Sequence, residues 1–445
     1  MNRSHRAGLP ATAAVAAIAL ALSACGSSGG SSSSSSSSAL TASAPGITAK
    51  TITIGSHQPL TGVAAPGYDE IAPASNAYFD YVDAHGGIYG RKIVYKFLND
   101  QYNPADTVSV VKQLVLQDNV YAIFDGLGTP THLAVAPFLN SEKVPDVFVA
   151  SGCECWNNPA QWPETFGWQL DYVREGKILG SYIKKHFAGQ KIGYFYQDDE
   201  FGKDGVKGLD DEIPAADVVS RQSYDPTNIN VGPQVAALKA AGAKVVVSFS
   251  VPAFSALLKL NSLKLGFSPT YVVSDVGADP ITLAGLLEAY AKQGGAKVSG
   301  NALTQGIITD AYLPSLGATS NSWIKLFTKI HSQYLPKLPL DGNVGYGLGA
   351  AYTFVQAMFK AGRNPTRQDL VNAINGGLPQ GPSLTPYGYS ASNHNGSTGA
   401  EITMIKNGVQ VPIGPVQVTD TSPTGAITTY STAQPAAPAS GIPSP

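Results

Sequence analysis

Short apolar runs that are typical of buried strands alternate with segments of helical periodicity over most of the chain. They form two groups, and runs in the second group begin about 26 residues apart, which leaves room for one helix and two turns. The runs are Thr51–Gly55, Lys92–Leu98, Val120–Gly126 and Pro145–Ser151, then Lys191–Gln197, Asp217–Ser223, Ala243–Ser250 and Thr270–Asp275. Because they are apolar on both faces, the pattern predicts two mainly parallel sheets that helices cover on each side.

The C-terminal third of the chain adds a further strand, several helices and a closing hairpin. Residues 302–309 have a strand pattern, and three helical segments follow before residue 377. Two strand-like runs then meet at Asn407-Gly408, a pair of residues that is typical of a tight hairpin turn. These elements are too few for a third sheet, so we expect them to complete the first two.

The first residues have the features of an export signal. A basic start at Arg3 and Arg6 precedes a short apolar run, and small residues lead to Cys25. The apolar run is shorter than the roughly 20 residues that a membrane-spanning helix needs. This arrangement predicts a lipoprotein signal peptide over residues 1–24 with lipid attached to Cys25, and an ordinary signal peptide is the alternative.

Two low-complexity segments flank the globular part. Residues 25–46 are rich in serine and glycine, which favours a flexible tether that buries no apolar surface. Residues 418–445 are rich in threonine, serine, proline and alanine, and we expect a disordered tail there. The folded sequence is therefore expected over residues 47–417.

Composition and motif spacing exclude several classes of function. Lys and Arg total 29 against 31 Asp and Glu, and this net charge of −2 argues against a nucleic-acid-binding protein. Three cysteines are too few for a disulfide scaffold or a four-ligand zinc site. HExxH and P-loop spacings are absent, and the G-x-S-x-G at residues 26–30 lies in the tether without a framing strand and helix. We therefore expect no catalytic residue, no cofactor and no metal.

Polar residues follow the ends of several predicted strands, which is where ligands bind in open parallel sheets. Thr129 and Pro130 suit a helix N-cap and a first helical position, and a helix start favours an anionic group. Ser151 and Ser250 end two further strands, and Asp275 ends another with a carboxylate that suits a ligand ammonium. Helix capping without a ligand explains these residues as well, so both interpretations stay open.

Cys153 and Cys155 flank Glu154 just after one of these strand ends. In an exported protein they can bond to each other, pair elsewhere or remain free. A structural role is favoured over a redox centre.

Four segments carry a resemblance to a known family: Ile54–Gly62, Ala84–Val108, Gly128–Gly152 and Tyr194–Leu209. They resemble the extracellular solute-binding proteins of branched-chain amino acid ABC transporters, of the leucine/isoleucine/valine-binding type. The likeness covers nearly all of the folded sequence, and GGIxGRKI followed by DxYxP is a specific part of it.

The resemblance implies an α/β, two-lobed type I periplasmic-binding fold, each lobe a mainly parallel sheet flanked by helices, with three hinge crossings. The first lobe is then expected over residues 47–171 and 300–376, and the second over residues 172–299 and 377–417. The crossings are expected near residues 171–173, 299–301 and 377–386.

The resemblance also assigns a ligand site. It implies that Thr129 and backbone groups at Ala150 and Gly152 hold a ligand carboxylate. Asp275 and Ser250 stand where the family's amino acid binders have a glutamate and a tyrosine, so both positions differ from the leucine-type pattern. The expected ligand-binding residues are Tyr68, Thr129, Ala150, Ser151, Gly152, Tyr172, Ser250 and Asp275.

The sequence thus predicts a non-catalytic solute-binding lipoprotein, exported and anchored by lipid to the outer face of the cytoplasmic membrane. It is expected to deliver a small amino acid or related carboxylate to the permease and ATPase subunits of an ABC importer. Within the same fold, a binder of an aromatic acid, amide or urea is the alternative, and a sensory receptor is another. A hydrolase is disfavoured because no nucleophile motif lies in a suitable structural setting.

Overall fold

The computed structural model describes residues 39–444. The predicted signal peptide, Cys25 and most of the serine-rich tether lie outside these residues. Within the described part of the chain, none of the helices combines the length and the hydropathy that crossing a bilayer requires.

The first sheet has five parallel strands in the order β2-β1-β3-β4-β5. Their bounds are Thr51–Gln58 (β1), Lys92–Asn99 (β2), Ile123–Phe124 (β3), Asp146–Val149 (β4) and Thr165–Gly167 (β5). The predicted parallel pairing is confirmed here, and β3 and β4 are buried on both faces as the apolar runs required.

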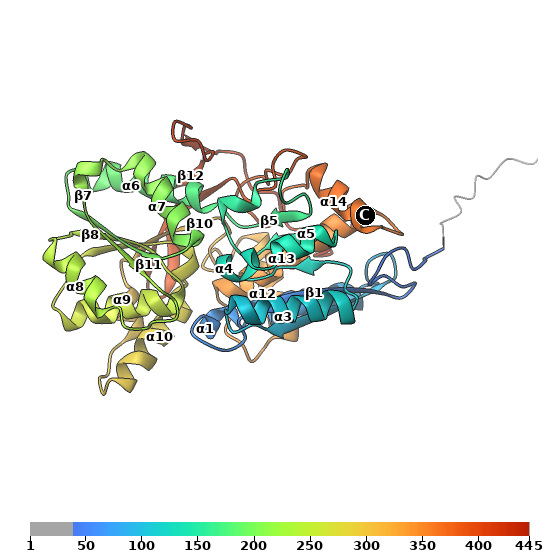
Figure 1. Cartoon of the computed structure of the whole chain (residues 1–445), viewed down its shortest axis with the longest axis horizontal. Coiled ribbons are helices and arrows are strands. Elements are labelled where there is room, and N and C mark those ends of the chain that lie inside the picture. Colours follow the sequence, from blue (N-terminus) through green and yellow to red (C-terminus); the bar gives the residue numbers. More distant parts are fainter. Residues whose placement is uncertain (1–38, 445) are drawn as a thin grey trace, which may run out of the picture. The chain divides into compact units, whose positions relative to one another are not determined.

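Helices from both ends of the sequence cover this sheet (Figure 1). They are α1 (Ala65–Tyr68), α2 (Ile71–Ala84), α3 (Pro104–Lys112), α4 (Thr129–Leu133), α5 (Ala136–Ser141), α12 (Ser322–Tyr334), α13 (Gly342–Ala361) and α14 (Arg367–Asn375). Helix α13 packs on α2 at Gly347, where a Cβ atom would lie only 2.3 Å from the carbonyl oxygen of Ile71. Phe79, Phe124 and Phe354 then meet as a ring cluster in the core. This sheet and these helices are the first lobe.

The second sheet is mixed, in the order β13-β12-β11-β10-β9-β8-β6-β7. Strands β6 (Ile192–Gln197), β7 (Val218–Tyr224), β8 (Val245–Phe249), β9 (Thr270–Val273) and β10 (Ile308–Ala311) are parallel. Strands β11 (Gly399–Lys406), β12 (Val409–Val418) and β13 (Thr428–Thr429) extend the sheet antiparallel. The hairpin turn at Asn407-Gly408 is confirmed, with φ angles of 53° and 78° that suit these two residues.

Six helices flank the second sheet and complete the second lobe. They are α6 (Tyr172–His186), α7 (Glu200–Glu212), α8 (Gly232–Ala240), α9 (Pro252–Lys264), α10 (Pro280–Gln293) and α11 (Gly300–Thr304). Helices α6 and α7 pack closely through small residues, because a Cβ atom on Gly208 would lie 2.1 Å from the carbonyl oxygen of Val173.

Two of the expected lobe boundaries differ from the observed ones. Strand β10 pairs with β9 in the second sheet, so the chain returns to the first lobe after Ala311 and not near residues 299–301. The segment before β11 still belongs to the first lobe, because the hydroxyl of Tyr389 donates to the carbonyl oxygen of Gly167 at 2.7 Å. The final crossing from the first lobe to the second therefore follows residue 390 and does not lie at residues 377–386. The chain passes from β5 of the first sheet to α6 of the second lobe through Asp171, which caps α6.

The segment after β12 is ordered against both lobes, in contrast to the expected disordered tail. The buried ammonium group of Lys177 on α6 donates to the carbonyl oxygens of Asp420, Ser422 and Gly425. Further along, side chains of the first lobe bind the same segment through Trp323 to Pro435 and Tyr78 to Gly441. An extended, proline-rich chain leaves its carbonyl groups without internal partners, and side-chain donors of the helices use them.

We predict that Lys177→Met lowers the free energy of unfolding by about 2 kcal/mol, because hydrogen bonds to a buried charged group are lost. It should also expose the chain beyond residue 419 to limited proteolysis. Chemical denaturation and mass spectrometry of the digest measure both effects. Lys184→Met is the matched control, since Lys184 lies on the same helix and is 55% exposed. Equal behaviour of the two variants would contradict this role for Lys177.

Candidate functional site

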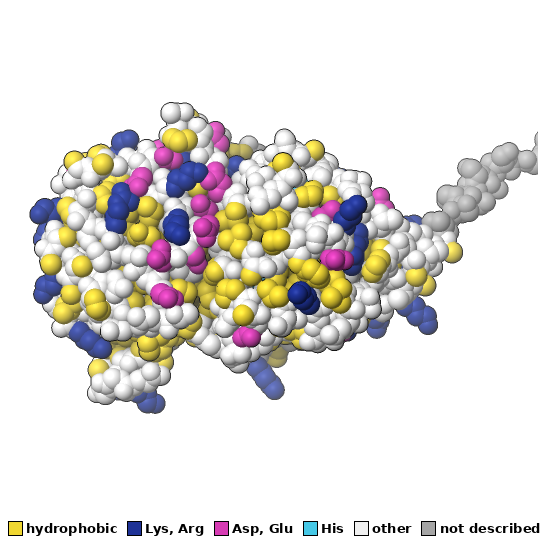
Figure 2. Space-filling view, in the orientation of Figure 1, with side chains coloured by type: hydrophobic (Ala, Val, Ile, Leu, Met, Phe, Trp, Pro, Cys, Tyr) yellow, Lys and Arg dark blue, Asp and Glu magenta, His cyan; other side chains and the backbone are white. Residues whose placement is uncertain are grey.

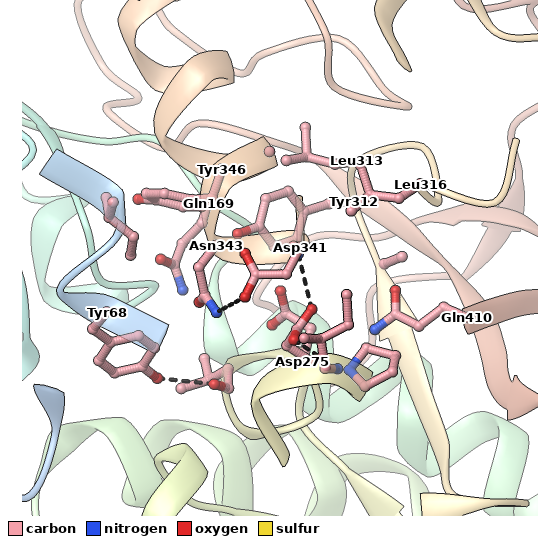
Figure 3. Close-up of a pocket in the computed structure, with 18 of the residues that line it drawn as sticks. Tyr68, Gln169, Asp275, Tyr312, Leu313, Leu316, Asp341, Asn343, Tyr346 and Gln410 are labelled. Carbon is pink, nitrogen blue, oxygen red and sulfur yellow. Dashed lines mark hydrogen bonds between the residues drawn. The ribbon is translucent and has the colours of Figure 1, made fainter. Parts of the chain in front are cut away.

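A cavity of about 360 Å³ lies between the two lobes, beyond the carboxyl ends of the parallel strands (Figure 3). The first lobe contributes Tyr68, Tyr102, Thr129, Ala150 and Tyr346 to its wall, and the second contributes Phe201, Val251, Asp275 and Asp310. Tyr312, at the crossing that follows β10, also belongs to the wall. A cavity of this size holds a small organic molecule. Its position at the strand ends is where open α/β sheets bind ligands.

The loop that follows β3 forms the first-lobe wall. Gly128 is the N-cap of α4 with φ of 103°, and Thr129 is the first helical residue, one position later than its expected role as the cap. Only glycine adopts such a backbone conformation without strain. The hydroxyl of Thr129 lies 2.7 Å from that of Ser151, and the N–H of Gly128 donates to the carbonyl of Ala150. The two strand ends are therefore joined behind the cavity.

The structure brings most of the expected ligand-binding residues to the cavity. Those in its wall are Tyr68, Thr129, Ala150, Tyr172 and Asp275. Ser151 lies directly behind Thr129, and Gly152 lies against Tyr172, whose N–H donates to its carbonyl at 2.7 Å. Ser250 is buried and outside the cavity wall, because its hydroxyl is bonded to those of Ser248 and Ser255.

Three carboxyl groups meet at the second-lobe wall. Oxygen atoms of Glu175, Asp275 and Asp310 all lie within 4.8 Å of one another. The N–H of Asp275 donates to Glu175 Oε1 at 3.1 Å and to Asp310 Oδ1 at 3.2 Å. Glu175 Oε2 and Asp310 Oδ2 are buried and have no hydrogen-bond partner among the described residues. We call these three residues the acidic triad.

Burial keeps protons on the acidic triad. Removal from water raises the pKa of Asp310 to about 7, and it raises the pKa of Glu175 and of Asp275 well above the usual range. The neighbouring charge of Asp310 raises the pKa of both partners further. The empty site thus favours the neutral acids, whereas a bound cation favours the carboxylates.

The sequence analysis found Asp275 but missed the two other members of the acidic triad. Glu175 lies in the first turn of α6, just after the first crossing between the lobes. Asp310 lies on β10, one residue beyond the strand that the sequence pattern predicted. The sequence did contain one signal for Asp310, namely a carboxylate directly after an apolar run that is typical of a buried strand.

A second group of acidic residues lies where the lobes meet at the edge of the cavity. Asp279 caps α10 and accepts the N–H of Gly342 from the other lobe at 2.8 Å. Asp341 caps α13 and accepts the hydroxyl of Thr282 from the other lobe at 3.1 Å. Burial, reinforced by Asp341, raises the pKa of Asp279 to about 6. We call Asp279 and Asp341 the rim aspartates.

Tyrosine hydroxyls add two further contacts between the lobes. Tyr68 donates to the carbonyl oxygen of Val276 at 2.8 Å, and Gln197 donates to the hydroxyl of Tyr102 at 3.1 Å. Both tyrosine rings also face the cavity. The lobes are thus held together by neutral hydrogen bonds as well as by the rim aspartates.

Four buried titratable residues form a hydrogen-bonded chain beside Gly126, in the loop that follows β3 and leads to the first-lobe wall. Asp100, His57, His132 and Asp146 are joined in that order by contacts of 2.8, 2.9 and 2.7 Å. Gly126 lies directly over the imidazoles, since a Cβ atom there would lie 2.6 Å from His57 Nε2.

Cys153 and Cys155 are bonded to each other in the structure, which selects one of the three arrangements that the sequence left open. The disulfide lies just beyond Gly152, in the segment that follows the end of β4. Neither cysteine belongs to the cavity wall.

Comparisons with known proteins agree with this geometry. A family model described as periplasmic binding protein matches residues 51–410. Leu/Ile/Val-binding protein homolog 3 from Brucella melitensis is 28% identical over 209 residues, which are 44% of this chain and 53% of that protein. The matched region therefore spans about half the length of this curated relative.

Solved structures share the fold. A branched-chain amino acid ABC transporter protein from Thermus thermophilus with bound valine superposes with a TM-score of 0.69 at 20% identity, covering 84% of this chain and 97% of the other. A fatty acid ABC transporter substrate-binding protein from Thermomonospora curvata superposes with a TM-score of 0.71 at 23% identity, covering 85% and 95%. The two-lobed α/β fold is thus confirmed as that of type I periplasmic binding proteins, and proteins that share it differ in ligand.

We predict that the stability of the empty protein falls as the pH rises from about 4 to about 7. In this window the folded state keeps the proton of Asp310, whose pKa is about 7, whereas the unfolded chain has lost it. Asp310→Asn should flatten this dependence and should be at least about 1 kcal/mol more stable than the parent at pH 8. Denaturation at several pH values measures it, with the exposed Asp210→Asn as control. Parallel pH profiles for the parent and Asp310→Asn would contradict the assignment.

Proposed function

The chain belongs to the periplasmic binding protein family, and from this premise we propose that it is the solute-binding lipoprotein of an ABC importer. It captures a small amino acid or a related compound between its lobes and delivers it to the permease. Family membership implies an extracytoplasmic location. The single observation that carries the proposal is the cavity between the lobes, with the carboxyl group of Asp275 at one wall and the hydroxyl of Thr129 at the other.

The two walls suit the two ends of an α-amino acid. On the first lobe, the hydroxyl of Thr129, which Ser151 contacts from behind, and the backbone at the strand ends face the carboxylate of the ligand. On the second lobe, Asp275 faces the ligand ammonium, and Glu175 and Asp310 support it. A zwitterion therefore leaves neither of its charges unpaired when the lobes close.

Contacts between the lobes supply a closing mechanism. Tyr68 with Val276 and Asp279 with Gly342 join residues of opposite lobes across the edge of the cavity. Hinge motion at the crossings between the lobes breaks these contacts and opens the cavity to solvent. The closed form is the one that the permease and its ATPase partner then recognise in this proposal.

The N-terminal features complete the proposal. Cys25 carries the lipid anchor, and the serine-rich tether spans the distance from the membrane to the folded lobes. Fractionation of Cys25→Ala protein tests this part, since the variant should leave the membrane without a change in ligand affinity.

Two substitutions test the polarity of the site. Asp275→Ala should weaken amino acid binding by about 3–5 kcal/mol, because it removes one partner of a buried charge pair. Thr129→Val should cost less, about 1–3 kcal/mol, because backbone donors remain for the carboxylate. Isothermal titration calorimetry with a panel of amino acids measures both. If Asp275→Ala binds as tightly as the parent, the ligand has no ammonium group at this wall, and an amide, urea or aromatic acid takes its place.

A further inference from the structure

The cavity continues beyond the polar groups of the ligand site into a part with apolar walls. Tyr68 and Gln169 lie on one side of Asp341, and Leu313 and Leu316 lie on the other side (Figure 3). We call this second part of the cavity the apolar arm. Its walls are formed by Ile281, Leu313, Leu316, Ile324, Phe327 and Leu340. The cavity thus has a polar end and an apolar end.

Both lobes build the apolar arm. Ile324 and Phe327 are three residues apart on α12 of the first lobe, so they share one face of this helix, and both are buried. Leu316 lies at the start of α13, since a Cβ atom on Gly345 would lie 3.8 Å from its side chain. Ile281 comes from α10 of the second lobe. The apolar arm therefore opens and closes with the lobes, as the ligand site does.

The polar groups beside the apolar arm have hydrogen-bond partners within the chain. Both carboxylate oxygens of Asp279 accept backbone N–H groups, and those of Asp341 accept an N–H and a hydroxyl. The hydroxyl of Ser315 donates to the carbonyl oxygen of Gln410 at 2.6 Å. The acidic triad, in contrast, keeps buried oxygens without a partner among the described residues. Polar groups of a ligand are therefore bound at the strand ends, and the apolar arm offers apolar contact.

The charges of the wall set the direction in which a ligand lies. The described residues of the cavity wall include no lysine, arginine or histidine. A ligand carboxylate beside the rim aspartates is repelled by them, so it stays at the wall formed by Thr129. The remainder of the ligand then points toward the apolar arm.

The apolar arm has exposed hydrophobic side chains at its open end. Ile281 on α10 and Val409 on β12 both belong to the cavity wall, and they are 43% and 39% exposed. A hydrocarbon chain that lies against them removes apolar surface from water, which is favourable. The two exposed side chains thus suit a ligand that fills the apolar arm.

The size of the cavity agrees with such a ligand. At about 30 Å³ for each water-sized group, a volume of about 360 Å³ holds roughly 12 of them. This is more than the number of non-hydrogen atoms in leucine. A ligand that occupies both ends of the cavity is therefore longer than leucine.

We propose that the ligand carries a hydrocarbon chain that enters the apolar arm while its polar groups are bound between Thr129 and Asp275. This inference rests on the proposed function and narrows its ligand to an amino acid whose linear aliphatic side chain is longer than that of leucine. A fatty acid of the same length shares the chemistry of a carboxylate joined to an aliphatic chain. The two differ in the ammonium, which only the amino acid offers to Asp275.

The surface beside the cleft has apolar groups that suit this ligand. On the face that Figure 2 shows, hydrophobic side chains of the first lobe gather beside a band of acidic side chains where the two lobes meet. Contact with such a surface holds a hydrocarbon chain near the cleft before it enters the cavity.

Calorimetry with four probes tests the proposal on the full chain. The probes are L-leucine, L-norleucine, L-2-aminooctanoate and octanoate. Because each buried methylene group strengthens binding about fourfold, we expect 2-aminooctanoate to bind at least about tenfold more tightly than norleucine or leucine. Octanoate, which lacks the ammonium, should bind more weakly than 2-aminooctanoate.

Failure of this inference and failure of the proposed function give different results. If leucine or norleucine binds as tightly as 2-aminooctanoate, no chain enters the apolar arm, and the amino acid function stands. If octanoate binds as tightly as 2-aminooctanoate, the apolar arm stands and the amino acid function is wrong. If none of the four probes binds, both proposals are overturned.

Leu316→Asn places the chain in the apolar arm. It puts a polar amide into the wall, so the affinity for 2-aminooctanoate should fall at least about tenfold while the affinity for leucine stays unchanged. The ratio of the two affinities is the readout, because a general loss of folding lowers both together. Equal losses for the two ligands would overturn the apolar arm.

Ile281→Asn is a second variant that leaves the core unchanged, because Ile281 is partly exposed. We expect it to lower the affinity for 2-aminooctanoate about threefold or more, again without an effect on leucine. Leu263→Asn is the matched control, since Leu263 lies on α9 outside the cavity wall and is equally exposed, at 43%. Equal affinities for 2-aminooctanoate in these two variants would contradict a chain that reaches the open end of the apolar arm.

Discussion

The cost of removing carboxyl groups from water governs how this site works. Oxygen atoms of Glu175, Asp275 and Asp310 lie within 4.8 Å of one another, and Glu175 and Asp310 are buried, so three ionised groups would repel there without the hydration that they have in solution. The empty protein meets this cost by keeping protons on them, as the raised pKa of each indicates. A cation that enters the cavity replaces those protons. Ligand binding, proton release and closure of the lobes are then one linked equilibrium.

The fold brings this cluster together from distant parts of the sequence. Asp275 follows a parallel strand, Asp310 lies on the neighbouring strand, and Glu175 lies in the first turn of the helix that follows the first crossing. The crossing after Ala311 separates Asp279 from Asp341, which therefore lie on opposite lobes at the edge of the cavity. The ordered C-terminal segment binds helices of both lobes outside the cavity. The groups that attract the ligand and the groups that join the lobes are thus neighbours.

Much of the fold could be predicted from the sequence, because strand-length apolar runs at regular spacing specify parallel sheets, and Asn407-Gly408 specifies a hairpin. The strand ends at Thr129 and Asp275 could be found for the same reason. The roles of Glu175 and Asp310 could not be predicted, because they depend on which strands are neighbours in the sheet. Strand β10 pairs in the second sheet, and Asp310 lies one residue beyond the end of the strand that the sequence predicted. The ordered C-terminal segment was missed because its contacts come from side chains such as Lys177 and not from its own composition.

A crystal structure of the protein grown with the amino acid that it binds most tightly in calorimetry tests the central claim most directly. The account predicts a ligand nitrogen about 2.7–2.9 Å from carboxylate oxygens of Asp275 and Asp310. A ligand whose carboxylate lies at the acidic triad, or a triad that binds only water in the closed form, would contradict it.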